Sequence, residues 1–219
     1  TAPTFGGSGI RGGAVNFNNN SYLCTDANAD GTCDSDTDFN AAAVGFTISL
    51  WFKHSVTAAS DTLFERCNTP ATPAVAVGCI YAGMTATGTI KIGLDSITTW
   101  TRETTYDDSV TSTATFNDNQ WHHLVYTNTD TDICLYIDGK QAAACDSSLA
   151  ATATLDAAQV LTLGGSCTGA ACVTGANFWD GSIDEFVWSS GTATTTDGIN
   201  ASAVNKLFLD GRTHKIRPT

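Results

Sequence analysis

Residues 121–140 constrain the fold of this chain more than any other stretch. Residues 121–127 divide into two alternating sets of side chains, as expected of a β-strand with two different faces. Residues 128–132 consist of turn-forming Asn, Asp and Thr, and residues 133–137 are a second β-rich run. Asp138-Gly139 then permits the positive φ angles of a two-residue hairpin turn. The stretch predicts strand, turn, strand and turn in antiparallel order.

Similar short runs recur along the chain, with turn residues rather than helices between them. The predicted strands are residues 14–17, 46–53, 62–66, 75–82, 89–94, 97–102, 160–164 and 182–188. Within the second of these, alternation predicts a core-facing set made of Phe46, Ile48, Leu50 and Phe52. Residues 199–210 carry apolar side chains at helical spacing. The chain is therefore predicted to be all-β, an antiparallel two-sheet sandwich with a short C-terminal helix.

The length of 219 residues fits one large β-sandwich domain. Residues 1–13 are Gly-rich and predict an extended arm, residues 14–212 the sandwich, and residues 213–219 a tail. Residues 21–38 are expected to form an Asp-rich insertion loop of the sandwich. The chain has neither an initiator Met nor a signal peptide, so we expect a mature product or a piece of a longer protein.

The net charge of −12 comes almost entirely from Asp, because Glu occurs only at positions 65, 103 and 185. An acidic surface disfavours binding to nucleic acid and to anionic membranes. No apolar run approaches 18 residues, so no membrane insertion is expected. Asp is abundant in turns, and its carboxylate is a good ligand for hard cations such as Ca²⁺.

The eight cysteines lie in four neighbouring pairs, Cys24/Cys33, Cys67/Cys79, Cys134/Cys145 and Cys167/Cys172. Local disulfides in an oxidising compartment follow from this spacing, and hence a secreted or cell-surface location. One pair conflicts with the predicted hairpin. A two-residue turn at 138–139 would place Cys134 opposite Ala143, so that Cys145 is a diagonal neighbour at roughly 7 Å. A disulfide needs Cβ atoms about 4 Å apart, so either the register shifts or this pairing is wrong.

The Asp-rich loop holds the sharpest local motif of the chain. Oxygen-bearing side chains stand at alternate positions, namely Asp26, Asn28, Asp30, Thr32 and Asp34. Gly31 permits a sharp turn, and this spacing is how a short loop wraps Ca²⁺, as in EF-hands. The motif departs from the EF-hand because its twelfth position is Thr37 rather than Glu. The alternative is an Asp-rich surface loop held by one disulfide.

Asp184 stands inside an apolar strand, where alternation predicts that it shares one face with Phe186 and Trp188. A carboxylate among aromatic side chains is costly without a partner. Two alternatives follow: Asp184 binds a structural Ca²⁺, or it accepts hydrogen bonds from loop amides.

Sugar binding requires exposed aromatic rings with polar side chains nearby. The candidates are Trp100, Tyr106 and Trp179, the last beside Asp180 in a Gly-rich loop. The alternative for each ring is packing against the body of the protein.

Catalytic residues are not predicted. The chain lacks a G-x-S-x-G elbow, and its three scattered Glu cannot form the E-x-D-x-x-E strand motif of jelly-roll glucanases. His122 and His123 are adjacent, but on a strand they point to opposite faces and cannot share one metal ion. We therefore expect both to be structural.

Four segments in order resemble the laminin-G-like jelly roll of the concanavalin-A-like lectin/glucanase superfamily. They are residues 46–53 (FTISLWFK), 121–140, 160–165 (VLTLGG) and 181–188 (GSIDEFVW). The resemblance covers residues 13–212. It implies an antiparallel jelly roll, often with a calcium ion. It further implies that Asp184 ligates this ion together with backbone carbonyls of residues 14–16.

These observations predict an extracellular, calcium-binding recognition or adhesion module that binds glycans or surface proteins. The alternative is a structural subunit of an extracellular filament or surface layer, in which copies of the chain bind one another through the arm and the tail. A polysaccharide-cleaving enzyme is the least favoured reading, because the fold hosts many functions but the carboxylate motif is absent.

Overall fold

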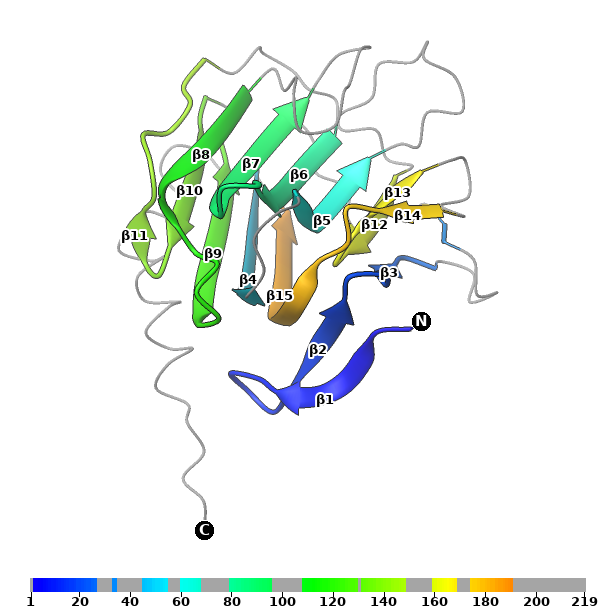
Figure 1. Ribbon diagram of the computed structural model, residues 1–219. Coiled ribbons are helices and arrows are strands. Elements are labelled where there is room, and N and C mark those ends of the chain that lie inside the picture. The colour runs from blue at the N-terminus through cyan, green and yellow to red at the C-terminus, as the bar shows by residue number, and fades with distance from the viewer. Residues whose placement is uncertain are drawn as a thin grey trace.

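Two antiparallel sheets stack face to face in a computed structural model of the chain (Figure 1). The structure describes residues 2–26, 33–34, 45–54, 60–67, 79–95, 108–129, 131–148, 159–168 and 174–190. Within these residues every regular element is a strand. The predicted all-β jelly-roll sandwich is confirmed, whereas the predicted helix at 199–210 and the strand at 97–102 lie outside the described residues.

The first sheet has seven strands. In spatial order they are β1 (Thr4–Ser8), β2 (Gly13–Asn18), β15 (Asp180–Ser190), β4 (Phe46–His54), β9 (Trp121–Asn128), β10 (Ile133–Ile137) and β11 (Lys140–Gln141). The residues predicted as a Gly-rich arm thus include a strand, because β1 pairs with β2 at the edge of this sheet.

The second sheet has six strands and a small annex. In spatial order the six are β3 (Leu23–Cys24), β12 (Val160–Leu163), β5 (Asp61–Cys67), β6 (Cys79–Met84), β7 (Thr89–Asp95) and β8 (Asp108–Thr115). The annex is a hairpin of β13 (Ser166–Thr168) and β14 (Thr174–Ala176). Among the described residues no helix is long and apolar enough to cross a bilayer.

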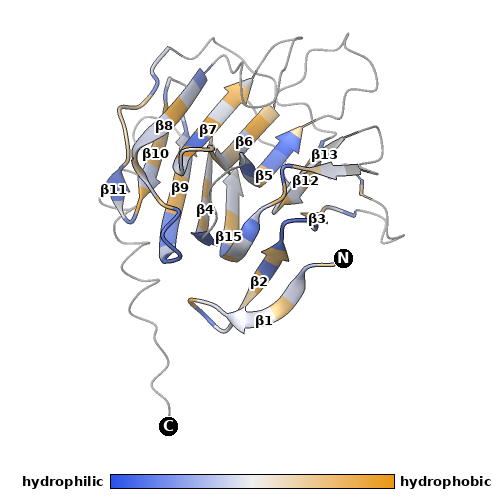
Figure 2. Cartoon of the chain, in the orientation of Figure 1, coloured by the Kyte–Doolittle hydropathy of each residue, from blue (hydrophilic) through white to orange (hydrophobic). Residues whose placement is uncertain are grey.

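The core lies between the sheets and contains the side chains that alternation predicted. The core-facing set of β4, Phe46, Ile48, Leu50 and Phe52, is at most 3 % exposed and belongs to one cluster with apolar residues of both sheets. Figure 2 shows hydrophobic and hydrophilic residues alternating along strands such as β2 and β7. Each sheet buries one face against the other, as a sandwich requires.

The predicted hairpin at residues 121–140 is confirmed. β9 and β10 pair antiparallel, and β10 turns into β11 through Asp138 and Gly139, whose φ angles are 53° and 76°. Two positive φ angles are typical of the tight turn that matches the twist of paired strands.

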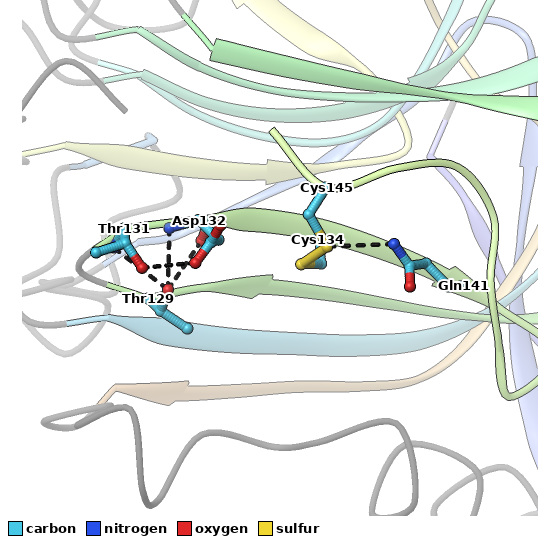
Figure 3. Close-up of a disulfide and its surroundings, with 6 residues drawn as sticks. All are labelled: Thr129, Thr131, Asp132, Cys134, Gln141 and Cys145. Carbon is cyan, nitrogen blue, oxygen red and sulfur yellow. Dashed lines mark hydrogen bonds between the residues drawn. A yellow bond between two sulfur atoms is a disulfide. The ribbon is translucent and has the colours of Figure 1, made fainter. Parts of the chain in front are cut away.

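A shift of register resolves the conflict around Cys134 and Cys145. Next to the turn, Tyr136 lies opposite Gln141, but Ile133 lies opposite Asp146, so the returning segment has slipped by two residues. The slip brings Cys145 directly opposite Cys134, and their Cα atoms are 4.5 Å apart in the disulfide (Figure 3). The disulfides Cys24–Cys33 and Cys67–Cys79 are also confirmed, and Cys172 of the fourth pair lies outside the described residues.

Candidate functional site

Asp184 binds backbone amides of the turn that joins β1 to β2. Its Oδ2 accepts hydrogen bonds from the amides of Ile10 at 2.6 Å and Arg11 at 3.2 Å, and its Oδ1 accepts one from the amide of Glu185 at 2.9 Å. Gly9 packs so closely that an added Cβ would clash with this carboxylate. The side chain, 8 % exposed, therefore fastens the N-terminal hairpin to β15.

A β-bulge overturns the predicted faces of this strand. The register of β15 on β4 shifts between Asp184 and Val187, and Glu185 has a φ of 51°. One extra residue moves every later side chain to the other face. Phe186 and Trp188 therefore pack against the core, while Asp184 lies opposite Trp51 on the outer face. The prediction that Asp184 shares a face with the two aromatics is wrong.

The surroundings of Asp184 do not fit a calcium ion. Three N–H groups direct their positive ends at the carboxylate, and a cation in the same place would repel them. Of the two alternatives for Asp184, the structure supports the one in which loop amides satisfy the side chain. No group of three or more His, Cys, Asp or Glu within the described residues is placed to hold a metal ion.

The ends of the Asp-rich loop are held together beside the Cys24–Cys33 disulfide. Asp34 donates its amide to the carbonyl of Thr25 at 2.8 Å, and the Thr25 hydroxyl donates to the carbonyl of Asp34 at 2.7 Å. The Oδ2 atom of Asp34 is buried and lacks a hydrogen-bond partner among the described residues. Of the other predicted ligands, Asp26 is exposed, and Asn28, Asp30 and Thr32 lie outside the described residues.

The two adjacent histidines point to opposite faces, as predicted. His122 places Nδ1 2.8 Å from Asp138 and Nε2 3.0 Å from Asp118. Burial opposes a charged ring, but the hydrogen bonds and charges of these carboxylates prevail and raise the pKa of His122. Both ring nitrogens are thus held as donors, which suits a structural role rather than metal binding.

His123 lies on the outer face against the ring of Trp51, 4.9 Å away between centroids. Its Nε2 is 2.8 Å from the hydroxyl of Ser49, and burial lowers its pKa to about 4. His123 is 3 % exposed, so a substrate has little access to its ring, whereas Ser49 is partly exposed.

Trp179 is fully buried, so its prediction as an exposed sugar-stacking residue is wrong. Its ring packs 4.4 Å from that of His54 and 6.0 Å from that of Phe52, measured between centroids. Trp179 instead anchors the start of β15 in the core. The other two predicted rings, Trp100 and Tyr106, lie outside the described residues.

A different aromatic pair occupies the surface beside Trp179. Tyr22 and Phe178 are both partly exposed, and their rings stack with centroids 6.2 Å apart and an interplanar angle of 29°. Two glycines form the floor beneath them. A Cβ on Gly165 would lie 3.0 Å from Tyr22 and 3.1 Å from Phe178, and one on Gly175 would clash with Phe178. The two rings therefore pack closely against these glycines, where a larger side chain would displace them.

Polar residues adjoin Phe178 and Trp179 along the chain. Asn177, with a φ of 47°, and Asp180 are partly exposed on either side of Phe178 and the buried Trp179. Asp180 lies opposite Asn18 on β2, and Asn18 accepts a hydrogen bond from the hydroxyl of Ser21 at 3.0 Å. The sequence predicts Trp179, rather than Tyr22 and Phe178, as the sugar-stacking residue. Strand alternation could have identified Phe178: if Trp179 points inward, its two neighbours in the chain point outward.

Comparison with known proteins identifies the family. A profile described as the concanavalin A-like lectin/glucanases superfamily, in its laminin-G-type branch, matches residues 19–199. The chain belongs to this family. No curated protein sequence matches it.

Solved structures of the same fold share little sequence with this family member. Domain 4 of the extracellular arabinanase AbnA from Geobacillus stearothermophilus, in complex with arabinotriose, is 16 % identical with a TM-score of 0.60, and 94 % of this chain aligns with 80 % of that one. CBM40 of the Ruminococcus gnavus IT-sialidase, bound to α2,3-sialyllactose, is 13 % identical with a TM-score of 0.58, with coverage of 85 % and 98 %.

Domains LG4-5 of the mouse laminin α1 chain are 16 % identical with a TM-score of 0.55. The alignment covers 93 % of this chain and 47 % of the laminin fragment, so the chain spans about half of that fragment. At these identities the likenesses show the fold. The laminin-G-like fold is typically a binding domain without catalytic activity.

Proposed function

We propose that this chain is a recognition module that binds glycans through the rim formed by Tyr22, Phe178, Asn177 and Asp180. The observation that carries the proposal is the stacked pair of partly exposed rings on a floor of two glycines. Sugar rings present apolar C–H faces and hydroxyl edges. A fixed aromatic surface bordered by amide and carboxylate groups offers a partner to each.

The side chains of this rim are well placed to bind without rearrangement. Burial raises the pKa of the Tyr22 hydroxyl, so the hydroxyl stays protonated and can donate to a ligand oxygen near neutral pH. Phe178 is followed directly by Trp179, which is held in the core. Two structures of the same fold carry sugars, arabinotriose in one and α2,3-sialyllactose in the other, and both lend support to a glycan ligand.

The test is a glycan array probed with the wild-type chain and with Phe178→Leu and Tyr22→Leu. Leucine retains apolar bulk over the glycines but removes the aromatic face, so binding should fall roughly tenfold or more for each variant. Phe116→Leu is the matched control, because Phe116 packs beside Phe52 and His122, away from the rim. Equal binding by Phe178→Leu and the wild type would contradict the proposed site.

Calcium is part of the same proposal and is assigned to the Asp-rich loop. Asp26, Asn28, Asp30, Thr32 and Asp34 are the proposed ligands. The buried, unpartnered Oδ2 of Asp34 supports this choice, because a buried carboxylate oxygen without a donor needs a cation or a water. Calcium bound to this loop would brace the segment that continues from Tyr22 through the Cys24–Cys33 disulfide.

Calcium binding is measured as the change of melting temperature on adding Ca²⁺ after treatment with EDTA. A ligand at about 100 times its Kd stabilises by about 2.7 kcal/mol, so the melting temperature should rise by several degrees. Asp34→Asn should abolish the rise, whereas Asp184→Asn should leave it intact. If the melting temperature of Asp34→Asn still rises with Ca²⁺, the ion binds at a site other than the Asp-rich loop.

We further propose that the chain acts outside the cell, as a secreted or surface-attached module. The three disulfides among the described residues support an oxidising compartment. The partner is a glycan or an extracellular protein, and Trp100 and Tyr106 remain proposed as additional ligand contacts.

A second candidate function, assembly of copies into a filament or layer, is favoured by β1. All five residues of this edge strand are exposed, and Phe5 is 71 % exposed. An uncharged, exposed edge strand is a template for pairing with another chain. Size-exclusion chromatography and negative-stain imaging test this candidate. Polymers that form in the wild type but not in Phe5→Lys would support this candidate. A wild-type chain that stays monomeric at high concentration would refute it.

A further inference from the structure

We infer that the rim selects neutral glycans over acidic ones and that Asp180 is the residue that sets this preference. This inference rests on the proposed glycan-binding function and adds the chemical class of the ligand. It is carried by the distribution of charge around Tyr22 and Phe178.

The segments that build the rim carry negative charges only. They are residues 18–26, 33–34, 159–168 and 174–181, and they contain three carboxylates and no Lys, Arg or His. The carboxylates belong to Asp26, Asp34 and Asp180. Since the whole chain has a net charge of −12, no excess of positive charge elsewhere offsets them. Because Asp26 and Asp34 are proposed to bind Ca²⁺, a uronic or sialic acid that approaches these rings is repelled chiefly by Asp180.

Asp180 is the carboxylate nearest to the aromatic pair along the chain. It follows Phe178 by two residues, with the buried Trp179 between them, and it is partly exposed. Among the described residues it forms no salt bridge. Its negative charge is therefore available to a ligand, either as an acceptor for sugar hydroxyls or as a barrier to a second carboxylate.

Three basic residues occur in the described elements next to the rim segments. Arg66 is fully buried and donates to the side-chain oxygen of Gln159 at 2.5 Å. Arg11 lies in the turn between β1 and β2, whose amides bind Asp184. Lys53 is the nearest on the sheet: it lies opposite Ser182, is partly exposed, and is a diagonal neighbour of Asp180 on the same face, about 7–8 Å away. Its positive charge offsets part of the charge of Asp180, so removal of the Asp180 carboxylate should favour acidic ligands all the more. None of the three belongs to a rim segment.

The expected selectivity follows from Coulomb's law. Two like charges about 7 Å apart at an aqueous surface repel enough to weaken binding roughly three- to tenfold, depending on how much water separates them. Dissolved salt screens this repulsion, because the Debye length falls from about 10 Å at 0.1 M to about 3 Å at 1 M ionic strength. Acidic glycans should therefore be disfavoured most at low salt.

The experiment compares neutral and acidic glycans that are otherwise alike. An array that includes lactose and α2,3-sialyllactose, with neutral and uronic-acid-bearing plant oligosaccharides, is probed with the wild type, Asp180→Asn and Asp132→Asn. Asp132→Asn is the matched control, since it removes the same charge in the turn between β9 and β10, the second and third strands from β15 in the sheet. Phe178→Leu reports whether any binding uses the rim.

The wild type should bind neutral members and exclude their acidic counterparts. Asp180→Asn should raise acidic relative to neutral binding roughly three- to tenfold at low salt, and Asp132→Asn should not. Acidic glycans preferred by the wild type, or no gain in Asp180→Asn, would overturn the selectivity while leaving the glycan-binding function standing. No binding to either class, or binding unaffected by Phe178→Leu, would overturn the proposed function and this inference with it.

Discussion

Removal of the Asp184 carboxylate should release the N-terminal hairpin from the sheet. Three backbone amides donate to it, and two of them come from residues more than 170 positions away in sequence. A hydrogen bond to a charged group contributes about 1.5–3 kcal/mol. The bond from Glu185 is local, so the two long-range bonds dominate. We expect Asp184→Ala to lower the free energy of unfolding by about 3–5 kcal/mol, or the melting temperature by roughly 10 °C.

The assay is equilibrium unfolding in urea with the disulfides intact, in parallel with and without EDTA. Asp184→Asn keeps one acceptor oxygen and should cost about 1–3 kcal/mol. Asp180→Asn makes the same change on the same strand, where the carboxylate accepts no hydrogen bond from the described residues, so it should stay within about 0.5 kcal/mol of the wild type.

Two results would refute the reasoning about Asp184. If Asp184→Ala lowers the free energy of unfolding by less than about 1 kcal/mol, water replaces the carboxylate as an equally good hydrogen-bond acceptor for the amides. A large loss that appears in calcium and vanishes in EDTA would mean that the carboxylate acts through a metal ion rather than through the amides.

Four further predictions concern stability and are checked by urea unfolding. His122→Gln should cost more at about pH 5.5 than at about pH 9, because a raised pKa gives stability that is present below the unfolded value and lost as the pH rises through the folded one. His123→Gln has the opposite signature: with its pKa lowered to about 4, His123 makes the wild type lose stability as the pH falls from 6.5 towards 4, and the variant should lose less over that range. Replacing Cys134 and Cys145 by Ala should cost about 3 kcal/mol, the loop entropy expected for cysteines 11 residues apart, and an unchanged midpoint would argue against the bond. Gly181→Ala should cost about 1–3 kcal/mol, because its Cβ would clash with the carbonyl oxygen of Lys53, and a neutral result would show that β15 can shift.

The strands with regular alternation could be predicted from sequence alone. The core face of β4 follows from period two, and the turn at Asp138-Gly139 follows from the two residues that tolerate positive φ. In both cases a local rule and the burial of one face require the same conformation.

Departures from regular pairing could not be predicted, since each depends on a neighbour distant in sequence. The bulge at Glu185 inserts one residue against β4 and reverses the faces of Phe186 and Trp188. The two-residue slip that unites Cys134 with Cys145 occurs after β11 has ended. Neither leaves a composition signal of its own.

The candidate site could also be predicted only in part. The stretch around residues 177–180 could be found because an aromatic residue, Asn, Asp and Gly occur together there. Which ring faces solvent could not, because the answer depends on His54 and Phe52, which enclose Trp179, and on Tyr22, which meets Phe178 from another part of the chain.

The burial of Trp179 has a thermodynamic consequence for recognition. A side chain that is ordered only on binding loses about 0.5–1.5 kcal/mol of rotamer entropy at that moment. Phe178 and Asp180 adjoin a residue that folding has already fixed, and the glycine floor restricts Phe178 further. The conformational entropy of ordering this surface is therefore lost during folding rather than on ligand binding. A ligand should meet a preorganised rim, and calorimetry should report only the ordering of the sugar itself.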